Sequence, residues 1–234
     1  MRTIRWIAVV LVAIAPIAAL ALWMTFQHVP AWYRPLRLSP EQIDDARATI
    51  TLFADSVSDQ MVETEPFEIV LTESQVNAWL AAMPHMLSEA EQWLPTQWSG
   101  LVVRFDVSAV RLGAHYSHRG WRAILSVGIS ARLAEDAQTV HLQLTDVHGG
   151  SLALPRWLVA DLLDEKLHEA FPSELLEESD DLARIILSST EPAHRLFEGI
   201  ELPNRFIWPN GQRRYRLESL ELAHQEVRLK IKPL

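Results

Sequence analysis

An uncharged apolar stretch near the N-terminus constrains this chain more than any other feature. It covers the nineteen residues from Trp6 to Met24, and Arg2 and Arg5 stand just before it. At about 1.5 Å of helical rise per residue, the stretch is roughly 28 Å long, close to the ~30 Å hydrocarbon thickness of a bilayer. The sequence therefore predicts a membrane-spanning helix followed by a tethered domain.

A cleaved signal peptide is the alternative interpretation of this segment. Signal peptides usually carry an apolar core of ~7–15 residues followed by small residues at the cleavage site. Ala19 and Ala21 supply small residues, but the apolar run continues to Phe26. Trp32 and Tyr33 then follow, as expected for an aromatic belt at the membrane surface. We therefore expect the segment to be retained as an anchor.

The orientation of the anchor follows from its very short N-terminal side. Arg34 and Arg37 balance Arg2 and Arg5 by count, but a short positive N-terminus normally stays in the cytoplasm while a long domain is translocated. We expect a single-pass membrane protein with a cytoplasmic N-terminus. Residues 1–39 are then the anchor and linker, and residues 40–234 are an extracytoplasmic domain.

The charge and cysteine content exclude several function classes. The chain has a net charge of −9, and its first 39 residues hold four arginines and no acidic residue, so the remainder carries −13. A domain this acidic is a poor candidate for binding nucleic acid by charge. Because the sequence has no cysteine, disulfides, thiolate catalysis and cysteine-ligated metals are also excluded.

Two amphipathic helices are predicted in the first part of the domain. A helix-start pattern at Ser39 precedes apolar residues that recur at three- and four-residue steps to about Glu63. A short extended run at 67–71 follows. A capping signature that begins at Thr72 then predicts a second helix, which extends to about Leu94.

The periodicity changes from helical to alternating in the middle of the chain. Alternation from Leu101 to Leu112 predicts a strand with a bulge near Val110, and a hairpin is predicted at 115–120. Strict alternation from Trp121 to Leu133 predicts a long second strand, and a third is predicted at 140–144. The short connections between these strands indicate an antiparallel meander.

A helical region follows the meander. The segment after Pro155 predicts a helix with Trp157 and Leu158 on its buried side, and residues 173–189 are also predicted to be helical. The C-terminal part returns to strands, at 200–202, 206–208, 215–222 and 227–231.

Two local features refine the C-terminal strands. Asn210 and Gly211 form the strongest hairpin signal in the chain. Arg228, Lys230 and Lys232 alternate along the last strand and are predicted to protect a sheet edge. The order of the elements predicts an α+β fold in which a long twisted antiparallel sheet packs on long amphipathic helices.

The motifs of common enzyme classes are missing from the sequence. It contains no G-x-S-x-G, S-x-x-K, H-E-x-x-H or G-x-G-x-x-G pattern. His115 and His118 have metal-ligand spacing, but no third donor stands near them, and His148 is similarly isolated. We therefore expect no catalytic residues, no metal and no cofactor, and hence a protein that is not an enzyme.

Tryptophan is the most notable side chain of the domain. Nine tryptophans occur in the chain, and those at helix faces and strand ends can serve core packing or line an apolar groove between sheet and helices. The candidate lining residues of such a groove are Trp79, Leu80, Met83, Leu125, Val127, Trp157 and Leu158.

The element order also resembles a known family. The anchor, the segment from Phe67 to Leu80, the long alternating strands and the segment from Gly150 to Pro155 resemble the YpmS-like family of membrane-anchored extracytoplasmic proteins. The shape of that family is similar to the tubular lipid-binding superfamily, which cradles lipids between a curved sheet and a long helix. The resemblance implies lipid binding and supplies no catalytic residues.

Two functions follow as expectations. The first is a non-enzymatic domain that binds a lipid or other apolar ligand at the membrane surface. The second is an envelope scaffold that binds a protein partner through a sheet edge or through the surface of the segment 173–189. A hydrolase assembled from distant residues is the third class, and it has no motif in its favour.

Overall fold

The structure is a computed structural model that describes residues 2–86, 96–118, 120–170, 192–207 and 213–234. Its helices are α1 (Arg2–Gln27), α2 (Pro40–Val62), α3 (Glu73–Met86), α5 (Arg156–Ala170) and α8 (Pro192–Glu198). All strand pairings among the described residues are antiparallel, which confirms the predicted α+β class.

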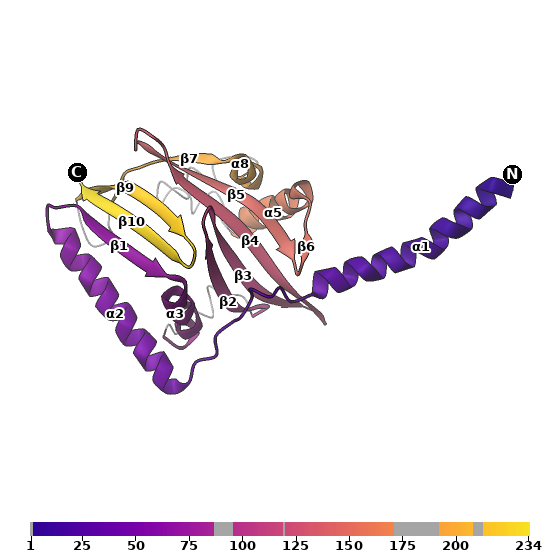
Figure 1. Cartoon of the computed structure of the whole chain (residues 1–234), viewed down its shortest axis with the longest axis horizontal. Coiled ribbons are helices and arrows are strands. Elements are labelled where there is room, and N and C mark those ends of the chain that lie inside the picture. Colours follow the sequence, from indigo (N-terminus) through magenta and orange to yellow (C-terminus); the bar gives the residue numbers. More distant parts are fainter. Residues whose placement is uncertain (1, 87–95, 119, 171–191, 208–212) are drawn as a thin grey trace.

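The strands form two sheets, whereas the sequence predicted one (Figure 1). The smaller sheet has the order β1-β10-β9-β8, and the larger has the order β2-β3-β4-β5-β6, with β7 also paired to β5. The strands are β1 (Phe67–Thr72), β2 (Trp98–Asp106), β3 (Ala109–His118), β4 (Trp121–Leu133), β5 (Thr139–Gly149), β6 (Leu152–Ala153), β7 (Ile200–Pro203), β8 (Phe206–Ile207), β9 (Arg214–Ala223) and β10 (Glu226–Pro233).

Helix α2 covers the smaller sheet. It begins with the predicted cap, in which the Ser39 hydroxyl accepts from Gln42 N–H and the Gln42 side chain accepts from Ser39 N–H. Its buried Val57 and Met61 pack against the sheet. The Tyr215 hydroxyl on β9 also donates a 2.6 Å hydrogen bond to the Met61 carbonyl, so the helix is fixed at its C-terminal end.

Helix α3 lies along the edge of β2 and closes it with side chains. Asn77 accepts a hydrogen bond from Val103 N–H and donates one to the Val103 carbonyl, both at 2.8 Å. The Glu73 carboxylate accepts from Phe105 N–H at 2.9 Å. Val103 and Phe105 then pack in one core with Val227 of β10, so this edge is also where the two sheets meet.

A single asparagine makes a second connection between the sheets. Asn204 is 3 % exposed, and its amide donates to the carbonyls of Ala137 in the larger sheet's β4–β5 turn and of Leu217 on β9, both at 2.8 Å. Its side-chain oxygen accepts from Leu217 N–H. Because the Asn204 side chain pairs three backbone groups in a buried position, it fixes the distance between the sheets.

Helices α5 and α8 cover one face of the larger sheet. Their buried residues Val159, Ala160, Ala193 and Phe197 pack with Leu144 of β5, and Val127 and Ile129 of β4 lie against this core. Trp157 and Leu158 point away from it, with exposed fractions of 64 % and 48 %. The prediction that these two residues are buried is therefore wrong, because α5 turns Val159 and Ala160 toward the sheet.

Helix α1 projects away from the rest of the molecule (Figure 1). Its C-terminal end contacts the body: the ring centroids of Trp23 and Trp121 lie 4.6 Å apart, edge to face, and Ser151 N–H donates to the Thr25 carbonyl at 3.0 Å. Gly150, with φ +60°, leaves no space for a side chain beside the carbonyls of Phe26 and His28. Among the described residues, none of the helices meets the length and apolarity required to cross a bilayer.

Two further sequence predictions are corrected by the fold. The phase change near Val110 is a turn at Val107 and Ser108, not a bulge, and this turn separates β2 from β3. Bulges instead interrupt the pairing between Ser99 and Val102, between Gly128 and Ile129, and between Lys230 and Ile231. β10 lies between β1 and β9, so its basic residues do not protect an edge.

The basic residues of β10 have acidic partners on the outer face of the smaller sheet. Lys230 and Lys232 lie 3.0 and 3.4 Å from the Glu218 carboxylate, which lowers the pKa of Glu218. The predictions for residues 87–94, 173–189 and 208–211 lie outside the described residues.

We expect Asn77→Ala to reduce the free energy of unfolding by about 2–4 kcal/mol, because the N–H and carbonyl of Val103 lose their partner at a partly buried edge. Urea denaturation of the full chain in detergent measures this change. Ser74→Ala, at an exposed position on the same helix, is the control and should change stability by less than about 0.5 kcal/mol. Equal losses in the two variants would contradict the role assigned to Asn77.

Candidate apolar binding site

A pocket of about 460 Å³ lies where α3, the start of β2 and the segment after α1 meet. Its lining is mainly apolar and comprises Pro35, Leu36, Leu80, Ala81, Pro84, Thr96, Trp98, Ser99, Gly100 and Leu101. Binding pockets for small molecules typically measure about 300–1,000 Å³ and are lined by apolar side chains with a few polar groups. The pocket has the size and the chemistry of such a site.

The backbone of β2 shapes the pocket. The pairing of β2 with β3 shifts between Ser99 and Val102, and Gly100 within this irregularity has φ +61°. A side chain at Gly100 would meet the Tyr33 hydroxyl at 2.8 Å and Pro35 at 3.2 Å. Glycine is therefore required both for the backbone conformation and for the close approach of the segment after α1.

Tyr33 holds that segment against the sheet. It is 7 % exposed, packs with Val102 and Ile124, and donates a 2.7 Å hydrogen bond to the Gly100 carbonyl. Burial raises the pKa of the Tyr33 phenol above its usual value. The folded body thus includes residues that precede position 40, and Pro35 and Leu36 become a wall of the pocket.

The predicted lining residues on α3 have different surroundings. Leu80 lines the pocket and also touches the core that joins the sheets. Trp79 packs on Phe53 of α2, with ring centroids 5.0 Å apart, and Met83 is exposed on the surface. Of the three, Leu80 is the residue that the structure places at the pocket.

The other predicted residues lie on the larger sheet and its helix. Leu125 and Val127 belong to β4, and Val127 packs against the α5–α8 core. Trp157 and Leu158 are on the exposed side of α5. β3 lies between β2 and β4 and so separates Leu125 and Val127 from the pocket, and Trp157 and Leu158 are not part of the pocket lining. The structure does not gather the predicted set around one cavity.

The sequence interpretation missed Trp98, Gly100 and the Pro35–Leu36 wall. Trp98 and Gly100 precede the strand that alternation predicted from Leu101, and Pro35 and Leu36 were assigned to a linker. One signal was present: Tyr33 and Trp32 form an aromatic pair beside the prolines, and such large side chains often pack on a nearby sheet.

A second hollow, of about 520 Å³, lies between the β4–β5 turn and β9. Charged side chains, Arg132, Glu135 and Glu218, contribute to its lining together with apolar residues such as Leu222. An apolar ligand would remove these charges from water and would bring no opposite charge to pair with them. This hollow is therefore a poorer site for an apolar ligand than the pocket beside α3.

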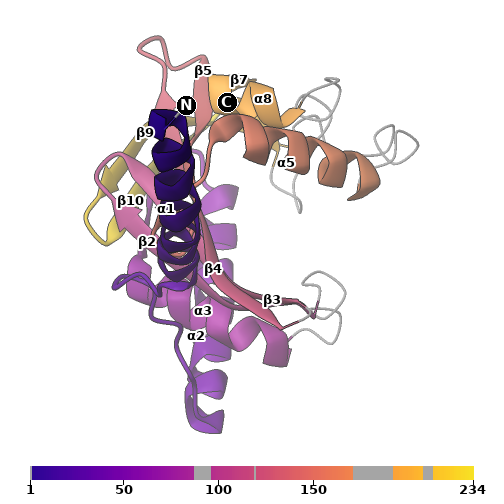
Figure 2. The ribbon, with the colours of Figure 1, turned by 90° about the vertical axis from the view of Figure 1, so that its right-hand side faces the viewer.

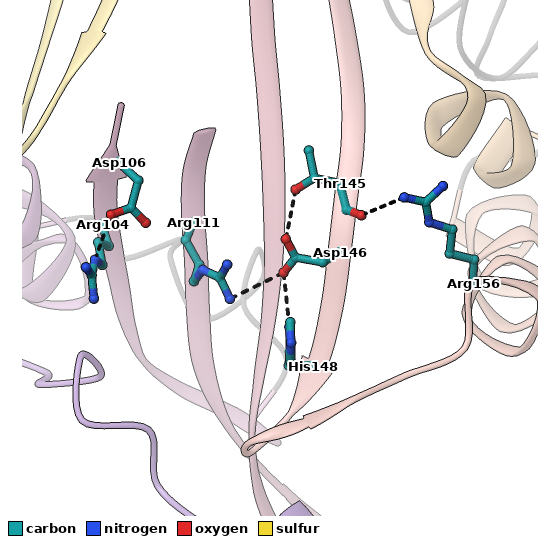
Figure 3. Close-up of polar contacts among 7 residues, drawn as sticks. All are labelled: Arg104, Asp106, Arg111, Thr145, Asp146, His148 and Arg156. Atoms are coloured by element: carbon teal, nitrogen blue, oxygen red, sulfur yellow. Dashed lines mark hydrogen bonds and ion pairs between the residues drawn. The ribbon is translucent and has the colours of Figure 1, made fainter. Parts of the chain in front are cut away.

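Charged residues on β3 and β5 meet across β4 (Figure 3). Asp146 lies 3.3 Å from Arg111 and 3.0 Å from His148, and it accepts a 2.9 Å hydrogen bond from the Thr145 hydroxyl. Gly128 stands between Arg111 and Asp146, and a side chain there would meet Asp146 Oδ2 at 2.7 Å. The missing side chain lets the ion pair join β3 to β5 across β4.

Ser126 faces His148 across the β4–β5 pairing, so a serine, a histidine and an aspartate lie near one another. Ser126 is 4 % exposed, and among the described residues its hydroxyl has no hydrogen-bond partner. Nucleophilic catalysis needs a serine that is hydrogen-bonded to its base and reachable by substrate. The arrangement meets neither requirement.

No group of three or more potential metal-ligating side chains occurs within the described parts of the chain. His115 lies 3.4 Å from the Ser99 hydroxyl, and His118 packs beside the Tyr116 ring. The two histidines therefore have separate surroundings in the β3 strand.

Comparison of the chain with protein-family models, with curated proteins and with solved structures finds no match.

We expect Tyr33→Phe to lower the free energy of unfolding by about 1 kcal/mol at neutral pH, because the hydrogen bond to Gly100 is lost. The raised pKa of Tyr33 adds a pH dependence: stability from the neutral phenol is present below about pH 10 and is lost as pH rises toward the folded-state pKa. The difference between wild type and variant should therefore shrink above pH 10. Urea denaturation of both proteins at neutral and at alkaline pH measures it, and a constant difference would contradict this role.

Proposed function

We propose that this protein is a membrane-anchored, non-enzymatic domain that binds an acyl chain or a similar apolar ligand in the pocket between α3, β2 and the Pro35–Leu36 wall. The observation that carries the proposal is the pocket itself, with its volume of about 460 Å³ and its mainly apolar lining. Trp98 and Leu80 supply large apolar surfaces, and Thr96 and Ser99 supply the few hydroxyls that can orient a polar end.

The anchoring part of the proposal rests on the sequence of α1 and on the exposure of its side chains. The helix contains the uncharged stretch from Trp6 to Met24, and from Ile14 on its apolar side chains are exposed outside the body. Such a surface is costly to keep in water, at about 25 cal/mol per Å² of apolar area. A bilayer would remove that cost. The ligand pocket would then be held near the membrane by the segment that forms one of its walls.

Ala81→Trp tests ligand binding by filling the pocket with an indole ring. We expect the full chain to bind a fluorescent long-chain fatty acid, and we expect the variant to bind it at least about tenfold more weakly, a loss of about 1.4 kcal/mol. Fluorescence titration of the full chain in phosphatidylcholine nanodiscs, with empty nanodiscs as the blank, measures both affinities.

Ala54→Trp is the matched control, because Ala54 lies on the exposed side of α2 and outside the pocket. It should bind the fatty acid as the unaltered chain does. Equal binding by both variants would show that the probe binds elsewhere, and absence of binding to the unaltered chain would remove the proposed ligand class.

A scaffold role is the second candidate, and the position of β1 favours it. β1 forms one edge of the smaller sheet, and among the described strands it pairs with β10 alone. A free strand edge can accept an extended segment of a partner protein. A photo-crosslinking amino acid in place of Val70 on β1, with Val107 as an exposed control position, tests this role. One discrete adduct at position 70, absent at position 107, would favour the scaffold.

A further inference from the structure

The exposed apolar residues of the domain include two that the sequence assigned to a buried face. Trp157 and Leu158 lie in the first turn of α5 and are exposed. Trp121, at the start of β4, is 56 % exposed. Trp121 meets Trp23 of α1 edge-on, so this pair of rings lies where the helix leaves the body. None of them lines the pocket proposed above.

Helix α5 and the start of β4 lie on the side of the body from which α1 projects (Figure 1). In Figure 2 α1 points toward the reader, while α5 lies across the view on the near side of the body. The backbone bond from Ser151 to Thr25 and the 2.6 Å contact between His28 Nδ1 and the Ser151 hydroxyl hold α1 to the β5–β6 turn. A bilayer that contained α1 would therefore face α5 and the β3–β4 hairpin.

The chemistry of this side is that of a membrane–water boundary. Tryptophan is enriched at both interfaces of a bilayer because its ring is apolar and its N–H is polar. Arg122 follows Trp121 in the sequence and is exposed. Arg156 precedes Trp157 and is also exposed, but its guanidinium donates to the Thr145 carbonyl at 3.1 Å and lies over the Phe197 ring, so Arg122 is the arginine that this side offers to a phosphate. Arginine beside tryptophan suits the level of the phosphate groups, where the cation stays hydrated and the ring enters the apolar region.

The negative charge of the domain indicates which lipid headgroups it can approach. Asp161 is exposed on the same side of α5, and residues 40–234 carry a formal charge of −13. An anionic bilayer would repel such a domain, whereas a zwitterionic surface would not. From these observations we infer that Trp157, Leu158 and Trp121 dock the domain against the zwitterionic headgroup layer of the same bilayer that holds α1. This inference rests on the proposed anchoring and is independent of the ligand in the pocket.

Single-cysteine labelling tests the docking, because the chain has no cysteine of its own. Ile17→Cys, Leu158→Cys and Val107→Cys each replace an exposed apolar residue, on α1, on α5 and in the β2–β3 turn. Val107 lies at the opposite end of β3 from the strand end that pairs with Trp121, roughly 30 Å away at 3.3 Å per residue. Each variant of the full chain is labelled with NBD and placed in phosphatidylcholine nanodiscs.

Nitroxide lipids then report the depth of each label. We expect acyl-chain nitroxides to quench the label at position 17, headgroup nitroxides to quench the label at position 158, and neither to quench the label at position 107. Quenching at position 17 without quenching at position 158 overturns the docking and leaves the anchor intact. Absence of quenching at position 17 overturns both. Equal quenching at positions 158 and 107 also overturns the docking, because it would show a surface with no preferred side.

Discussion

Asn77 and Glu73 close the edge of β2 with their side chains, and this closure determines where the two sheets and the pocket lie. A strand edge carries N–H and carbonyl groups that must be paired when they are buried. Here Asn77 and Glu73 pair those of Val103 and Phe105, so among the described strands β2 is the last of the larger sheet, and α3 lies beyond it. Because α3 also borders the smaller sheet, the same contact brings the two sheets together. The pocket opens at the end of this edge, where the pairing of β2 becomes irregular.

The segment between α1 and α2 connects the proposed membrane anchor to the candidate binding pocket. Tyr33 is part of the core of the larger sheet, and Pro35 and Leu36 face the pocket. Removal of residues 1–39 to obtain a soluble domain would therefore remove a wall of the pocket and a buried aromatic ring. An experiment on ligand binding needs the full chain for this physical reason.

Local patterns predicted the elements of this fold well, and contacts between distant residues account for what they missed. The cap at Ser39, the start of α3 after Thr72 and the bounds of β4 follow from short sequence patterns, and the structure confirms them. The turn at Val107 was missed because an exposed valine continues the alternation of β2. The division into two sheets depends on Asn77 and Asn204, whose partners are 26, 67 and 13 residues away, and no local pattern contains such pairs. The candidate site was predicted at Leu80 alone, because its other walls come from a strand bulge and from a segment outside the predicted domain.

The junction at Gly150 has a mechanical consequence. A helix that is joined to a domain by a flexible linker can change its tilt while the orientation of the domain stays the same. Here the last turn of α1 and the β5–β6 turn share backbone hydrogen bonding, and Gly149 and Gly150 lie so close to the helix end that little relative rotation fits. A change in the tilt of α1 would therefore rotate β4 and β5 together with the helix. If a bilayer holds α1, the bilayer thickness affects the tilt of the helix. Through this junction the bilayer thickness would then also affect the orientation of the whole domain relative to the membrane.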